Sequence, residues 1–194
     1  MAITINHQTN DISATSGSMT IDGASAGGAM SLISTTTLSG TATAAEITLP
    51  QGYKYFEFFI PRLSSATESS FNMQIKNGST TQAAKYVANR NVKVSISSFQ
   101  TPVGSTSSTF IQTTNFSIGN AAGEAGIGGF IRVWDARSAT DVTRILFDLI
   151  GEINDGRLMR AHGGAVQVTA ADTDTIRLYI SGNLTGEIQL WGVV

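Results

Sequence analysis

The chain has 194 residues, a net charge of −2 at neutral pH and no cysteine. Its length suits one domain, or one domain with a short appendage. The charge balance excludes the basic surface of a nucleic-acid-binding protein or of one held on an anionic membrane, and the absence of cysteine excludes disulfides and thiolate chemistry.

The polar residues of this chain are mostly uncharged. Only 13% are Asp, Glu, Lys or Arg, whereas there are 21 Ser, 24 Thr and 20 Gly. Threonine and the β-branched apolar residues fit a pleated sheet, and good helix formers are scarce. This composition predicts a β protein, and it suits a protein that packs against copies of itself, because few charges would have to be buried.

The first 30 residues differ from the rest, since no Lys or Arg occurs before residue 46. Short apolar alternations separated by Gly/Ser-rich turns predict small strands that find partners on other chains. We expect residues 1–30 to be an extended anchor or stem segment, and a disordered polar leader is the alternative. No secretion signal or membrane-spanning stretch is expected. The apolar positions of the segment are Ile3, Ile5, Ile12, Met19 and Ile21.

Residues 31–194 are expected to form a single β domain. The stretch YKYFEFFIP (53–61) is apolar on both faces, which is typical of a strand in the middle of a sandwich or at an interface. Asn154-Asp155-Gly156 predicts a hairpin turn, and residues 101–108 and 119–128 are expected to be loops. Further predicted strands are residues 71–77, 84–99, 109–119, 128–136, 144–153, 164–170, 174–182 and 186–194.

These strands predict an all-β fold, an antiparallel two-sheet sandwich of jelly-roll type with an extended N-terminal arm. A single open sheet would leave one apolar face and two edges in water. In the last strand, Ile188 and Leu190 are expected to point into the core, and Trp191 to the outer face or a subunit contact.

Residues that could carry catalysis are few. The chain has two histidines, His7 and His162, and no GxSxG motif, so we expect no catalytic residues, no metal site and no cofactor. Asp148 lies on the strand face opposite its apolar neighbours, which indicates solvent exposure or a salt link to an arginine. A glycosidase-like carboxylate pair could be formed, for example, from Asp135, Asp141, Asp148 or Glu152, and nothing in the sequence shows that any two of them face each other. The protein is therefore not expected to be an enzyme.

A ligand or interface surface is predicted around the two tryptophans. Trp134 could stack on a sugar ring while Asp135 and Arg137 hold its hydroxyls, or it could point into the core. Trp191 is the second aromatic candidate for such a surface.

The stretch SLISTTTLSGTATAAEITLPQGYKYFEFFIPRLSSAT (31–67) and the ending DTIRLYISGNLTGEIQLWGVV (174–194) together resemble small virion proteins of tailed bacteriophages. In that family's ending Tyr is expected where Trp191 stands. ITINHQTNDISATSGSMTIDG (3–23) is similar to tail-fibre stalks. The resemblance implies a non-enzymatic virion protein assembled in the host cytoplasm: a homotrimer that decorates the capsid or forms a short fibre, with other virion proteins as partners.

A second function stays open, a tail-fibre tip that recognises a host surface glycan. The predicted loops and exposed aromatic residues would then carry the binding. A carbohydrate-binding module of cellular origin would be expected to carry a secretion signal.

Overall fold

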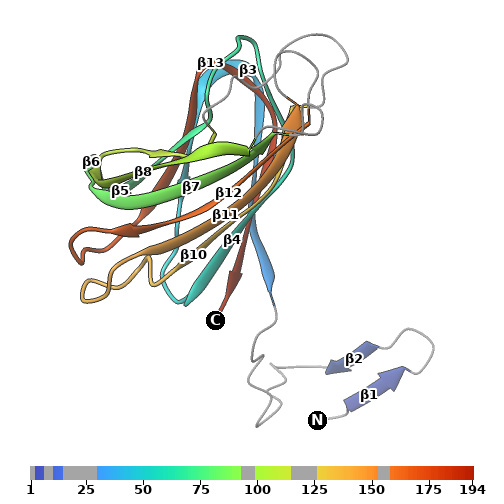
Figure 1. The fold of residues 1–194 in the computed structure, drawn as a ribbon. Coiled ribbons are helices and arrows are strands. Elements are labelled where there is room, and N and C mark those ends of the chain that lie inside the picture. The colour runs from blue at the N-terminus through green and yellow to red at the C-terminus, as the bar shows by residue number, and fades with distance from the viewer. Residues whose placement is uncertain (1–2, 7–10, 15–29, 93–98, 115–125, 153–157) are drawn as a thin grey trace.

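The computed structural model describes residues 3–6, 11–14, 30–92, 99–114, 126–152 and 158–194 (Figure 1). Over these ranges the chain forms thirteen strands and no helix. The described part therefore contains no helix that could span a membrane. The expectation of an all-β fold is confirmed.

Eleven of the strands belong to one sheet in which every pairing is antiparallel. Its main path runs β6-β5-β13-β4-β10-β11-β12-β7-β8, with β3 paired to β13 and β9 to β5. The strands are β3 (Ser31–Thr48), β4 (Tyr55–Ser65), β5 (Asn72–Asn77), β6 (Thr80–Gln82), β7 (Ala84–Val92), β8 (Phe99–Ser108), β9 (Ile111–Gln112), β10 (Ile127–Trp134), β11 (Arg144–Glu152), β12 (Leu158–Gln167) and β13 (Thr175–Val193).

The sheet curls strongly, as Figure 1 shows. The predicted division into two sheets of a jelly roll is not confirmed, because the strands form one continuous hydrogen-bonded path. Strand β13 explains this continuity. Its first part pairs with β5 and its last part with β4, while β3 runs along its other side, so the two regions of the sheet stay joined.

Strand β13 also corrects the expectation of two strands, residues 174–182 and 186–194. The register shifts between Tyr179 and Leu184, and the strand continues through Gly182. A side chain at Gly182 would overlap the Thr67 hydroxyl. A glycine that indicated a strand end therefore allows close contact with the segment after β4.

The core fills the inside of the curl. In β4, Phe56, Phe58 and Ile60 are fully buried, whereas the alternate residues point outward. Ile188 and Leu190 of β13 are also buried, which confirms their predicted direction. Each such side chain contributes about 1.5–3 kcal/mol of hydrophobic stabilisation.

The hairpin predicted at residues 154–156 is supported by the strands on each side. β11 and β12 pair antiparallel up to Glu152 opposite Leu158, and the turn itself lies outside the described residues. The expected loop at 101–108 is wrong, since this segment belongs to strand β8, which pairs with β7. A side chain at Gly104 would lie 2.6 Å from the Tyr86 carbonyl oxygen, so the glycine reflects close strand packing.

Two more predicted segments are described only in part. The expected strand at 109–119 is described as far as residue 114, and within this part Ile111–Gln112 forms strand β9. Residues 115–119 lie outside the described ranges. Of the expected loop at 119–128, residues 119–125 lie outside them, and the last two residues begin β10.

Near the N-terminus, β1 (Ile3–Asn6) and β2 (Asp11–Ala14) pair antiparallel as a separate two-stranded sheet. Ile3, Ile5 and Ile12 lie in these strands, whereas Met19, Ile21 and His7 lie outside the described residues. The anchor or stem role of residues 1–30 stays a prediction.

Candidate binding surface on the outer sheet face

The outer face of the sheet is the side that points away from the core. Strand register brings its side chains into rows across β10, β11, β12 and β7. One row contains Trp134, Arg144, Val166 and Lys85 in that order. The next row contains Arg132, Leu146, Gly164 and Val87.

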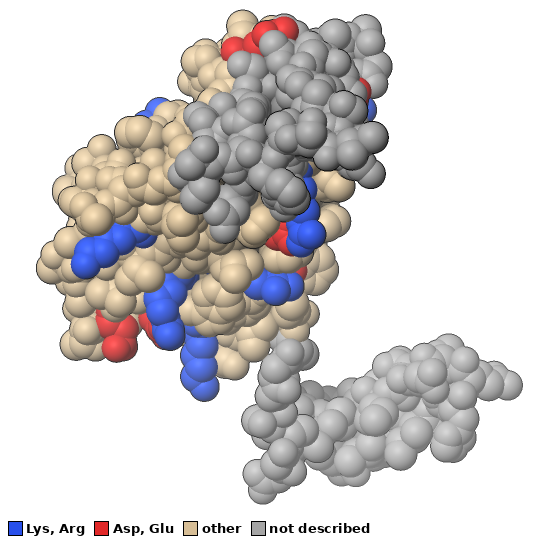
Figure 2. All heavy atoms as spheres, in the orientation of Figure 1, with Lys and Arg blue, Asp and Glu red and all other residues tan. Residues whose placement is uncertain are grey.

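This face carries an unusual number of exposed aliphatic side chains. We call five of them the outer apolar patch, with exposed fractions of 40–55%: Val87, Leu146, Ile150, Leu158 and Val166. Figure 2, seen from the same side as Figure 1, shows a mainly uncharged surface with scattered basic and acidic groups. Single exposed apolar residues are normal, but neighbouring ones on one face indicate an interaction site.

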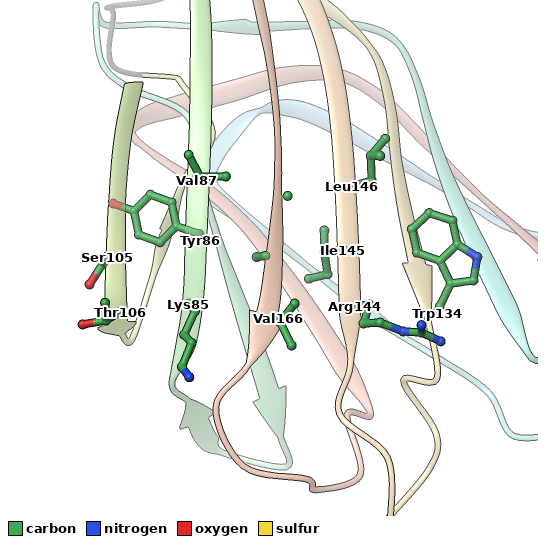
Figure 3. A pocket seen from close by; sticks show the side chains of 12 residues that line it. Lys85, Tyr86, Val87, Ser105, Thr106, Trp134, Arg144, Ile145, Leu146 and Val166 are labelled. Atoms are coloured by element: carbon green, nitrogen blue, oxygen red, sulfur yellow. The ribbon is translucent and has the colours of Figure 1, made fainter. Parts of the chain in front are cut away.

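A groove of about 690 Å³ runs along three residues of the patch, Val87, Leu146 and Val166 (Figure 3). The other two, Ile150 and Leu158, line a separate hollow. The lining of the groove is mainly apolar. Trp134 and Arg144 stand at one end and Lys85 lies on the opposite side. The lining residues are Lys85, Tyr86, Val87, Ser105, Thr106, Trp134, Arg144, Ile145, Leu146, Gly164, Ala165 and Val166.

The acids near the patch are bound by arginines of the same chain. The Arg160 guanidinium donates to Asp148 with a 2.8 Å bond from Nε to Oδ1, which confirms the salt link expected for Asp148. This bond holds the pKa of Asp148 below its usual range, against the opposing effect of burial. Arg144 forms an ion pair with Asp135.

A third ion pair lies further along the face. Arg132 Nε donates to Glu57 Oε2 at 2.7 Å, and the Tyr55 hydroxyl donates to the same oxygen at 2.6 Å. Burial, together with this hydrogen bond, raises the pKa of Tyr55. These three pairs bring equal numbers of positive and negative groups to the face.

Replacing Arg160 by glutamine is expected to raise the pKa of Asp148 toward its usual value, because the main hydrogen bond to the carboxylate is lost. A lowered pKa in the folded state stabilises the fold above the unfolded-state pKa, and this contribution disappears as pH falls through the folded-state pKa. Carbon-detected NMR titration of the carboxyl groups measures the shift. An unchanged Asp148 titration in Arg160→Gln would show that the ion pair does not control it.

The predicted surface residues are only partly brought together. Trp134 is half-buried on the outer face and packs against Tyr55 with 5.3 Å between ring centroids. Trp134 therefore does not point into the core, which was the alternative that the sequence left open. Asp135, with a φ of 57°, follows it and pairs with Arg144 at the end of the groove.

Arg137 and Trp191 do not line this groove. Arg137 lies 3.3 Å from Asp172, measured from Nη1 to Oδ1, and borders a smaller hollow with Asp135. Trp191 is on the outer face of β13 opposite Glu57, and its Nε1 donates to Gln189 Oε1 at 3.3 Å.

The aliphatic residues of the outer apolar patch are missing from the surface predicted from sequence. A signal for them exists in RILFDLIGE (144–152), where Leu146 and Ile150 occupy positions that alternation assigns to the solvent face. Apolar residues on both faces of a strand indicate a second contact.

The described residues contain no group of three or more metal-binding side chains that could hold an ion. His162 lies opposite Asp148 in the pairing of β11 with β12. Asp148 and Asp135 are each bound to a different arginine. The face thus presents paired charges and aliphatic surface, which suit binding more than proton transfer.

A comparison of the chain with protein-family models, curated proteins and solved structures found no match.

Proposed function

We propose that this chain is a non-enzymatic structural protein of a tailed-bacteriophage virion, a homotrimer that decorates the capsid or forms a short surface fibre. The resemblance of residues 31–67 and 174–194 supports the proposal, together with the antiparallel all-β fold. The main support for the proposal is the outer apolar patch, because an aliphatic surface with paired charges is typical of a face that contacts another protein.

In this role the curled sheet acts as a jelly-roll-like sandwich in which β13 belongs to both layers. Residues 1–30 act as the anchor or stem that attaches the domain to the capsid or tail. Removing them leaves the sandwich folded and weakens attachment.

Co-sedimentation tests this role. Purified chain is mixed separately with empty capsid shells, with isolated tails and with host cells. A decoration protein sediments with shells, and its version lacking residues 1–30 stays in the supernatant. Sedimentation with cells alone would contradict the decoration role and favour receptor binding.

A second candidate function is glycan recognition by a tail-fibre tip, and Trp134 at the end of the groove favours it. An indole at a groove edge can stack on a sugar ring.

If this second function holds, Trp134→Ala is expected to weaken glycan binding at least tenfold with the fold intact, because the stacking platform is lost. Glycan arrays followed by calorimetry measure the effect. Trp191→Ala is the matched control, since this tryptophan lies outside the groove lining. Equal losses in both variants, or no binding by the native chain, would exclude the groove as a glycan site.

A further inference from the structure

We propose that the outer apolar patch is the contact surface between copies of this chain, with the Lys85 end of one copy against the Trp134 end of the next. This inference rests on the homo-oligomer of the proposed function and names the surface that builds it.

The patch has the composition of an interface core. Leu146 and Val87 lie in the same row, on either side of Gly164, and Val166 lies in the adjacent row. Because Gly164 has no side chain, the space between Leu146 and Val87 stays open. This space is part of the flat, mainly apolar groove. Burying this aliphatic surface against protein removes it from water, which favours association.

The acidic groups on the outer face do not prevent contact with a second copy of the chain. Asp148 and Asp135 are each neutralised by an arginine of their own chain. These two pairs add no net charge to the contact, whereas a strongly charged face would repel its copy. A second copy of the chain therefore suits the patch.

The two ends of the groove are complementary to each other. Lys85 forms no ion pair with the residues that the structure describes, and it lies three strands away from Trp134 in the same row. At the usual strand spacing this separation is about 14 Å. An ammonium group is attracted to the face of an indole ring, so Lys85 of one copy suits Trp134 of the next.

A surface with unlike ends forms head-to-tail contacts, and such contacts close into a ring when the rotation between copies permits. A sugar fits this groove less well. Its lining is mainly apolar, and a sugar site needs several polar groups to hold the hydroxyls.

Light scattering on a sizing column tests the inference with the full chain. Leu146→Glu is expected to weaken self-association at least a hundredfold, so that the variant elutes with the mass of one chain where the native protein is oligomeric. Phe110→Glu is the matched control, because Phe110 is 41% exposed and Leu146 is 42% exposed, and Phe110 lies outside the groove lining. Circular dichroism checks that each variant is folded.

Lys85→Glu provides an independent test that leaves the aliphatic surface intact. It reverses the charge at one end and is expected to weaken association about tenfold, whereas Lys54→Glu, outside the groove lining, leaves it unchanged. This test decides the inference if Leu146→Glu fails to fold.

The results separate the two proposals. If folded Leu146→Glu is still oligomeric, the patch is not the contact surface, and the proposed function still stands. If Leu146→Glu does not fold, an oligomer that persists in Lys85→Glu leads to the same conclusion. A native chain that is monomeric at every concentration overturns both the contact surface and the homotrimer.

Discussion

Replacing Phe58 by alanine is expected to lower the free energy of unfolding by about 3–5 kcal/mol. Phe58 is fully buried in β4, and its strand neighbours are Ile131 of β10 and Leu190 of β13. All three side chains belong to the core, so the cavity left by the ring would lie in the middle of the sheet, where neighbours can relax little. Denaturant unfolding followed by tryptophan fluorescence measures the loss.

The next residue in the chain is the control. Phe59 is 43% exposed on the opposite face of the same strand, so Phe59→Ala is expected to cost roughly 1 kcal/mol or less. Similar losses for the two phenylalanines would contradict the assignment of inner and outer faces to β4.

Replacing Gly129 by alanine is expected to destabilise the fold by about 2–5 kcal/mol, from backbone strain and steric overlap together. Gly129 has a φ of 137°, and an added Cβ would overlap the Asp148 carbonyl oxygen and lie 3.0 Å from Leu149 Cα. Strands β10 and β11 would have to separate at this point. Thermal unfolding of the variant measures the loss.

Gly52→Ala separates strain from overlap. Gly52 has a φ of 92°, and a Cβ there would meet nothing within 4 Å. This variant is expected to lose only the strain contribution, about 1–2 kcal/mol. If Gly129→Ala were no more destabilised than Gly52→Ala, the close approach of β10 and β11 would be wrong.

Strand positions could be predicted well where one face is buried. In β11, alternation predicted that Asp148 points away from the core, and the structure adds the arginine from β12 that binds it. In β13, alternation also predicted the directions of Ile188 and Leu190. Period-two patterning is local information, and the sequence contains it directly.

Sheet organisation could not be predicted in the same way. Glycines that normally mark turns here permit close packing, at Gly182 against Thr67 and at Gly104 against the backbone of β7. Whether a glycine ends a strand or lets two segments approach depends on its partners, which a single sequence does not show. For this reason the sequence predicts two strands where β13 is one, and a loop where β8 lies. The prediction of two separate sheets has another basis, the apolar face and the two edges that a single open sheet would leave in water.

Only part of the candidate surface could be predicted, for a similar reason. Trp134 was recognised from its residue type, whereas Val87 and Val166 become neighbours in space only through the pairing of β7 with β12. Leu146 joins them through the pairing of β11 with β12. Long-range register of this kind follows from the whole fold.

The most direct test of the account is the native mass of the full chain, measured by native mass spectrometry or sedimentation equilibrium beside a version lacking residues 1–30. The account predicts three times the 20.4 kDa of one chain for the full-length protein. A trimer in both versions would place the contacts in residues 31–194, as the outer apolar patch requires. A single-chain mass for the full-length protein at every concentration would contradict the homotrimer on which the structural role depends.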